Sequence, residues 1–120
     1  MSHMDFKRLV KSFRFATQGT ITTIKEEQNI KIYLFFALLN LILGLVSHLN
    51  FVEWAIIVIT ISVTLGVEII NIALEELLDM ISPEYNGRIK MIKDVAAGSA
   101  LITALASIII FCLIYFPHWF

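Results

Sequence analysis

The chain has 120 residues, of which 58% are hydrophobic, and its formal net charge is −1. Its mean hydropathy of +0.84 excludes a water-soluble domain of this size, because one modest core could not bury so much apolar surface. The near-neutral charge gives no reason to expect a nucleic-acid partner. A single cysteine, Cys112, excludes an internal disulfide.

The N-terminal region predicts a helix on the membrane surface. Residues 1–4 resemble a cloning remnant, and we expect residues 5–120 to form one domain. From Asp5 to about Gln18, apolar residues recur at helical spacing on one face and basic residues fall mostly on the other. That pattern indicates an amphipathic helix lying in the interface. Gly19 and the threonines after it predict a break or bend before the next element.

Three apolar blocks follow, at about 32–49, 51–81 and 95–116, the second of them acidic toward its end. A helix needs roughly 20 residues to cross the ~30 Å hydrocarbon layer, and each block reaches about that length. Turn signals at 82–87 separate the second block from a third helix expected to start around 89–93. We therefore predict an all-α integral membrane protein with three transmembrane helices.

The basic residues predict the orientation of the chain. All nine Lys and Arg residues lie before the first span or between the second and the third. An excess of basic residues marks the cytoplasmic side, so the N-terminus is expected inside and the C-terminus outside. Trp54 and Trp119 then fall at the outer interface, where His48 and His118 are interpreted as interfacial filler.

The third helix carries small residues at a regular interval. Ala96, Ala100 and Ala104 stand four residues apart. Small side chains at this spacing allow two helices to approach closely in lipid. We expect this face of the helix to pack tightly against a neighbouring helix.

The second span contains a polar stripe. In "GVEIINIALEELLDMI", Glu68, Asn71, Glu75 and Asp79 are spaced three, four and four residues apart. At about 100° per residue they lie within about 80° of one another, whereas Glu76 points off the stripe. Asp79 is expected near the cytoplasmic surface and Glu68 well inside the membrane.

The stripe has a structural and a chemical interpretation. Polar residues in a span can join helices through hydrogen bonds, and for Asn71 alone that role is as good as any other. Several carboxylates without basic partners in the spans favour function instead, because they are expensive in lipid. Carboxylate and amide oxygens suit Mg²⁺, and the basic residues Arg88, Lys90 and Lys93 could hold phosphates. Together they suggest phosphoryl transfer to a membrane-embedded hydroxyl.

At this point the sequence resembles a known family. "EIINIALEELLD", followed fourteen residues later by "KDVAAGSA", is similar to the signature of the small prokaryotic membrane lipid kinases. These include diacylglycerol kinase and the undecaprenol kinase of Gram-positive bacteria. The family pattern is E-x-x-N-[TS]-A-x-E-x-x-x-D and then A-K-D, from which Ile72 and Ile92 depart. The resemblance implies ATP and Mg²⁺, a homotrimer with sites between subunits, and the bacterial cytoplasmic membrane.

The resemblance also implies roles for individual residues. Glu68 would be the catalytic base that takes the proton from the lipid hydroxyl. Glu27 and Glu75 would bind Mg²⁺, and Asn71 would support that site. The residues implied in ATP binding are Arg8, Glu27, Glu75, Asp79, Tyr85, Asn86, Lys93 and Asp94.

Several of these residues have simpler interpretations. Glu27 could form an ion pair with Lys31 one turn further on. Lys93 could be a charge that only sets the topology, and Arg8 could anchor the chain to lipid head groups. Tyr85 and Asn86 could be plain turn residues.

The lipid substrate is the least determined part of the prediction. "KEEQNIKI" resembles the corresponding stretch of undecaprenol kinases more than that of diacylglycerol kinases, so undecaprenol is expected and diacylglycerol is the alternative. A more distant alternative is a small proton-coupled transporter that uses Glu68 as its ion site. A purely structural membrane subunit is the third.

Overall fold

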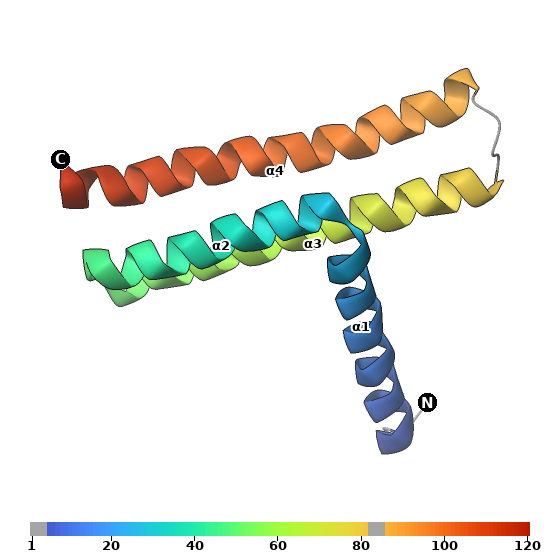
Figure 1. Ribbon diagram of the computed structural model, residues 1–120, viewed down its shortest axis with the longest axis horizontal. Coiled ribbons are helices and arrows are strands. Elements are labelled where there is room, and N and C mark those ends of the chain that lie inside the picture. The colour runs from blue at the N-terminus through green and yellow to red at the C-terminus, as the bar shows by residue number, and fades with distance from the viewer. Residues whose placement is uncertain (1–4, 82–85) are drawn as a thin grey trace.

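The computed structural model describes residues 5–81 and 86–120, so the expected cloning remnant lies outside the described residues. The described chain forms α1 (Phe6–Glu26), α2 (Gln28–Ser47), α3 (Phe51–Ile81) and α4 (Gly87–Trp119). Figure 1 shows α2, α3 and α4 running alongside one another, while α1 leaves this bundle at a steep angle.

Three of the helices are long and apolar enough to cross a membrane, as predicted. They are α2 with 20 residues, α3 with 31 and α4 with 33. At 1.5 Å per residue, α3 and α4 measure roughly 45–50 Å, which exceeds the ~30 Å hydrocarbon layer. α1 joins α2 part-way along α3, so one end of the α3–α4 pair projects beyond the corner between α1 and α2 (Figure 1).

The start of α4 and the continuity of α1 both differ from the predictions, and local hydrogen bonds explain the differences. α4 begins at Gly87, before the expected 89–93, because the Asn86 side chain caps it and accepts the Ile89 N–H at 2.9 Å. α1 has no break at Gly19. Three threonine hydroxyls in α1 each donate to the carbonyl oxygen four residues earlier, at 2.8–2.9 Å: Thr17, Thr20 and Thr23. Bonded in this way, their side chains are satisfied without interrupting the helix.

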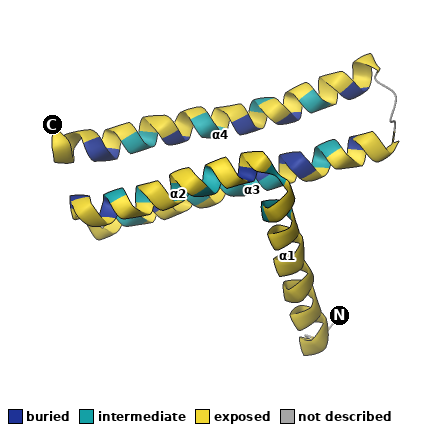
Figure 2. Cartoon of the chain, viewed as in Figure 1, coloured by how far each residue is buried: buried dark blue, intermediate teal, exposed yellow. Residues whose placement is uncertain are grey.

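The three long helices differ in how closely they pack. The contact between α3 and α4 is the most extensive, and α2 packs more against α3 than against α4. Ala96 and Ala100 of α4 are each 8% exposed, in agreement with the predicted close packing of this face. α1 is exposed along almost its whole length, and most outward faces of the bundle are exposed too (Figure 2). Exposed apolar faces of this kind suit a bilayer.

The turn between α2 and α3 is tightly packed. His48 ends α2 in the left-handed region, with φ 57°. A Cβ atom built at Gly44 would stand 2.7 Å from the Trp54 ring, so only glycine allows this approach. The buried cluster at this end contains Leu49, Ile57 and Tyr115.

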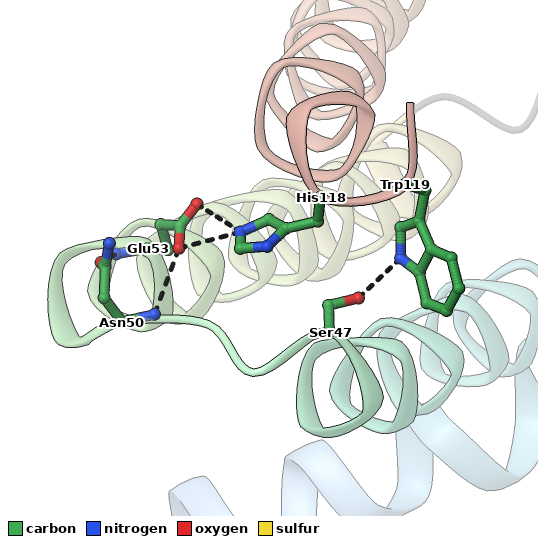
Figure 3. A network of polar contacts seen from close by, with 5 residues as sticks. All are labelled: Ser47, Asn50, Glu53, His118 and Trp119. Carbon is green, nitrogen blue, oxygen red and sulfur yellow. Dashed lines mark hydrogen bonds and ion pairs between the residues drawn. The ribbon is translucent and has the colours of Figure 1, made fainter.

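Polar contacts join the last turn of α4 to the same end of the bundle (Figure 3). His118 Nε2 lies 2.9 Å from a carboxylate oxygen of Glu53, and the Trp119 indole N–H donates to Ser47 Oγ at 2.8 Å. The Tyr115 hydroxyl donates to the Asn40 carbonyl oxygen at 2.9 Å. The His118 side chain thus links α4 to α3.

Candidate active site

Three carboxylates gather where α1 meets α2. Glu68 of α3 is only 5% exposed. The Asn29 side chain, in the first turn of α2, hydrogen-bonds to its carboxyl group, and the charges of Glu27 and Glu75 act on it electrostatically. Glu27 is the residue between α1 and α2, with φ −103° and ψ 120°. The fold thus brings Glu27 to the polar stripe of α3, although 40 residues separate it from Glu68 in sequence.

Glu68 lies level with the first turn of α2, because Asn29 of that turn hydrogen-bonds to its carboxyl group. Since α2 is 20 residues long, that turn is one end of the helix rather than its middle.

Asn71 combines burial with an unsatisfied oxygen. The residue is 8% exposed, and no described residue hydrogen-bonds to its Oδ1. Leaving a buried acceptor unpaired costs about 1–3 kcal/mol. This oxygen therefore takes no part in joining the described helices. The oxygen remains available to a ligand.

Asp79 and Lys93 lie together on the projecting part of the α3–α4 pair. Lys93 Nζ is 2.6 Å from Asp79 Oδ1, with side chains 33% and 64% exposed. One turn of α4 brings together a second pair, in which Lys90 Nζ lies 2.6 Å from Asp94 Oδ2. Two predicted nucleotide residues, Asp79 and Lys93, are thus neighbours in space.

The other predicted nucleotide residues are not drawn into this group. Arg8 lies near the start of α1, about 27 Å along that helix from Glu26. Tyr85 falls outside the described residues. The Asn86 side chain caps the start of α4.

The site can be tested against the needs of Mg²⁺. Within 5–81 and 86–120, no three His, Cys, Asp or Glu side chains are close enough to hold a metal ion by themselves. Mg²⁺ commonly uses one or two carboxylates and takes its remaining oxygens from water and substrate phosphates. Glu27 and Glu75 fit that pattern. The alternative ion pair between Glu27 and Lys31 does not form among the described residues.

Comparison with known proteins identifies the family. The family model described as prokaryotic diacylglycerol kinase matches residues 14–115. The chain belongs to this family. A relative named undecaprenol kinase, from Bacillus subtilis (strain 168), is 34% identical over 113 residues, covering 94% of this chain and 92% of the relative. A diacylglycerol kinase from Synechocystis sp. is 30% identical over 103 residues, covering 85% of this chain and 59% of the relative.

The protein is therefore an integral membrane lipid kinase, as the resemblance implied. Family membership favours this reading over the transporter and the structural subunit. Sequence reasoning did not single out Asn29, which contacts Glu68, or Tyr33, which lies one turn further along α2 and also interacts with Glu68. The available signal was that Asn29 and Tyr33 stand four residues apart, on one helix face, directly after Glu26 and Glu27.

Proposed function

We propose that this kinase transfers the γ-phosphate of ATP to the hydroxyl of undecaprenol, in a reaction that depends on Mg²⁺. The observation that carries the proposal is the buried Glu68 carboxylate, approached by Glu27 and Glu75 from two elements. Diacylglycerol is the alternative acceptor.

The length of α2 supports a position for this site in the membrane. Twenty residues span about 30 Å, so α2 crosses the hydrocarbon layer only if its first turn lies at one boundary. The basic residues favour the cytoplasmic boundary of the bacterial inner membrane, with the N-terminus inside and the C-terminus outside. α1 would then lie along that surface, and the projecting ends of α3 and α4 would reach the cytoplasm. Glu68 would sit where a lipid hydroxyl and a soluble nucleotide can meet.

In the proposed reaction Glu68 acts as general base. Its carboxylate accepts the proton of the lipid hydroxyl, the lipid oxygen bonds to the γ-phosphorus of ATP, and the bond to the β–γ bridging oxygen breaks to release ADP. Asn29 orients the Glu68 carboxyl group through its side chain. Positioning of this kind supplies most of the catalysis expected in phosphoryl transfer.

The remaining polar residues would bind the nucleotide. Glu27 and Glu75 would hold Mg²⁺, which supplies positive charge to the phosphate oxygens when bound, with Asn71 in support. Lys93 would contact the phosphates while Asp79 keeps its ammonium group in place at 2.6 Å. Asp94, Tyr85 and Asn86 would complete the nucleotide site at the cytoplasmic surface.

Arg8 supports a composite site in a homotrimer. Because α1 carries Arg8 away from the carboxylates of its own chain, Arg8 would reach nucleotide only in a neighbouring subunit (Figure 1). The exposed apolar faces of the bundle are compatible with such contacts. We propose that each site takes its carboxylates from one subunit and Arg8 from the next.

Similarity to the Bacillus subtilis undecaprenol kinase over 94% of the chain supports undecaprenol as the acceptor. The relatives named diacylglycerol kinase, from Synechocystis and Helicobacter pylori, are less similar, at 30% and 27% identity.

The test is transfer of labelled γ-phosphate from Mg-ATP to lipid in mixed micelles, with undecaprenol and diacylglycerol in parallel. We expect undecaprenol to be phosphorylated faster, and Glu68→Gln to abolish transfer to either lipid, since an amide cannot accept the proton. Glu76→Gln is the matched control, because Glu76 is exposed one residue from the stripe. Full activity of Glu68→Gln would refute the assigned base, and omission of Mg²⁺ should stop the wild-type reaction.

A further inference from the structure

An apolar cavity lies between α2, α3 and α4. Its volume is about 370 Å³, within the range of roughly 300–1,000 Å³ typical of small-molecule pockets. Its walls include Phe36, Leu65 and Ile108. A cavity of this size and composition suits a section of hydrocarbon chain.

One end of the cavity adjoins the candidate active site. On α2 the cavity wall begins about one turn from Asn29, and Tyr33 is part of it. On α3 the wall includes Thr64, which precedes Glu68 by one turn. The charge of Glu68 acts electrostatically on the Tyr33 hydroxyl. A lipid hydroxyl that reaches Glu68 can therefore have its chain in the cavity.

Most polar groups of the cavity wall are already bonded to their own helices. Thr64 Oγ1 donates to the Thr60 carbonyl oxygen at 2.7 Å, and Ser107 Oγ donates to the Ala104 carbonyl oxygen at 2.7 Å. Asn40 Nδ2 donates to a carbonyl of α2 at 2.8 Å.

Tyr33 is different from the other polar residues of this wall. Its hydroxyl makes no hydrogen bond to any residue that the structure describes. The side chain is half-buried, so the hydroxyl can be reached from the cavity. Among the hydroxyl groups of this wall, that of Tyr33 is thus the one that remains available to a ligand.

We propose that Tyr33 positions the lipid substrate: its hydroxyl donates a hydrogen bond to the oxygen of the lipid hydroxyl, while the chain next to that hydroxyl occupies the cavity. The lipid O–H then points at Glu68, and no proton leaves Tyr33. This inference rests on the proposed lipid kinase function and adds a residue that selects and orients the acceptor.

The same arrangement bears on which lipid is accepted. In a polyprenol the chain beside the hydroxyl is pure hydrocarbon, which the apolar walls can cover. In diacylglycerol, ester oxygens lie within a few bonds of the hydroxyl and need donors. The Thr64 and Ser107 hydroxyls of the wall already donate to their own helix, and the Asn40 amide has one of its two N–H groups bonded in the same way. The cavity therefore favours a polyprenol.

The first test removes the Tyr33 hydroxyl alone. In mixed micelles with undecaprenol and Mg-ATP, Tyr33→Phe should lower kcat/KM for the lipid about tenfold, as expected for one lost hydrogen bond, and leave the KM for ATP unchanged. Tyr115→Phe is the matched control, because Tyr115 is not part of the cavity wall and its hydroxyl is bonded to the Asn40 carbonyl oxygen. That variant should keep kcat/KM within about twofold of the wild type.

The second test fills the cavity. Ala104→Phe places a ring in the cavity wall, whereas Ala106→Phe places the same ring on an exposed face of α4. Only Ala104→Phe should raise the KM for undecaprenol, by about tenfold. Size-exclusion chromatography establishes that both variants remain assembled.

Each outcome is decisive. Wild-type kcat/KM in Tyr33→Phe, or equal losses in Tyr33→Phe and Tyr115→Phe, would overturn the inference while the kinase function stands. Equal KM values for the two alanine variants would overturn the chain site. An inactive wild-type protein would overturn the proposed function itself.

Discussion

Two buried polar residues of α3 differ in whether their side-chain oxygens have a hydrogen-bond partner. Glu68 is 5% exposed and has Asn29 as a partner, whereas Asn71 is 8% exposed with its Oδ1 unpaired among the described residues. An unpaired buried acceptor destabilises the protein unless a ligand completes it. At the residue scale, the unpaired Asn71 oxygen lowers the stability of the protein and leaves an acceptor for a ligand.

Replacing Asn71 should therefore change stability and kinase activity in opposite directions. Asn71→Leu removes the unpaired oxygen at similar volume, so we expect the free energy of unfolding to rise by about 1 kcal/mol while phosphorylation falls at least tenfold. Thermal unfolding in detergent and the micelle assay measure the two effects. Leu78→Asn, at a buried apolar position of the same helix, is the control and should only destabilise. A destabilised Asn71→Leu would instead mean that the amide has a structural partner.

At the scale of the elements, α3 and α4 are joined differently at their two ends. At the projecting end, the Lys93–Asp79 pair is largely exposed, and such pairs contribute at most about 1 kcal/mol to stability. At the other end, the Glu53–His118 pair is more buried, with side chains 22% and 27% exposed, and Trp119 adds a hydrogen bond to Ser47 (Figure 3). The first end suits ligand exchange, and the second suits a fixed anchor.

Removing the anchor should affect stability more than catalysis. His118→Ala is expected to lower the free energy of unfolding by about 1 kcal/mol and to leave kcat within about twofold, because Glu68 lies about 25 Å along α3 from Phe51. Thermal unfolding and the kinase assay in the same detergent measure both. His48→Asn is the matched control, since asparagine tolerates the left-handed backbone of that position. A large loss of activity without destabilisation would contradict a purely structural anchor.

At the scale of the whole molecule, a single chain does not assemble all of the predicted site. α1 projects from the bundle and takes Arg8 away from Glu68 and Lys93 (Figure 1). The carboxylates that gather around Glu68 come from the α1–α2 corner and α3 of the same chain. This division is what a site shared between subunits requires.

Subunit mixing tests the division. Arg8→Ala and Glu68→Gln should each be nearly inactive alone, yet mixed subunits should regain a measurable share of activity, because some sites then take wild-type residues from both chains. Activity is measured after the two variants are unfolded, mixed and reconstituted together. Mixing Glu68→Gln with Glu75→Gln is the control and should restore nothing, since both residues belong to one chain's share of the site. If the mixture of Arg8→Ala and Glu68→Gln regains no activity, Arg8 either acts in the site of its own subunit or belongs to no site.

The sequence determined what depends on one helix at a time. Apolar runs predicted the three spans, and a repeat of three and four residues put Glu68, Asn71, Glu75 and Asp79 on one face of α3. These features follow from the pitch of the helix and the thickness of a bilayer, both of which are local and known in advance.

Only the tertiary structure decided which helices bring which groups together. It brought Asn29 and the charge of Glu27 to Glu68, placed Glu68 level with the start of α2, and paired His118 with Glu53. It also showed that Asn86 caps α4 and that α1 is continuous through Gly19. The relations between helices depend on how far each helix projects past its neighbour and on how closely side chains pack. Neither quantity follows from the periodicity of a single segment, so the arrangement of the site depends on the tertiary structure.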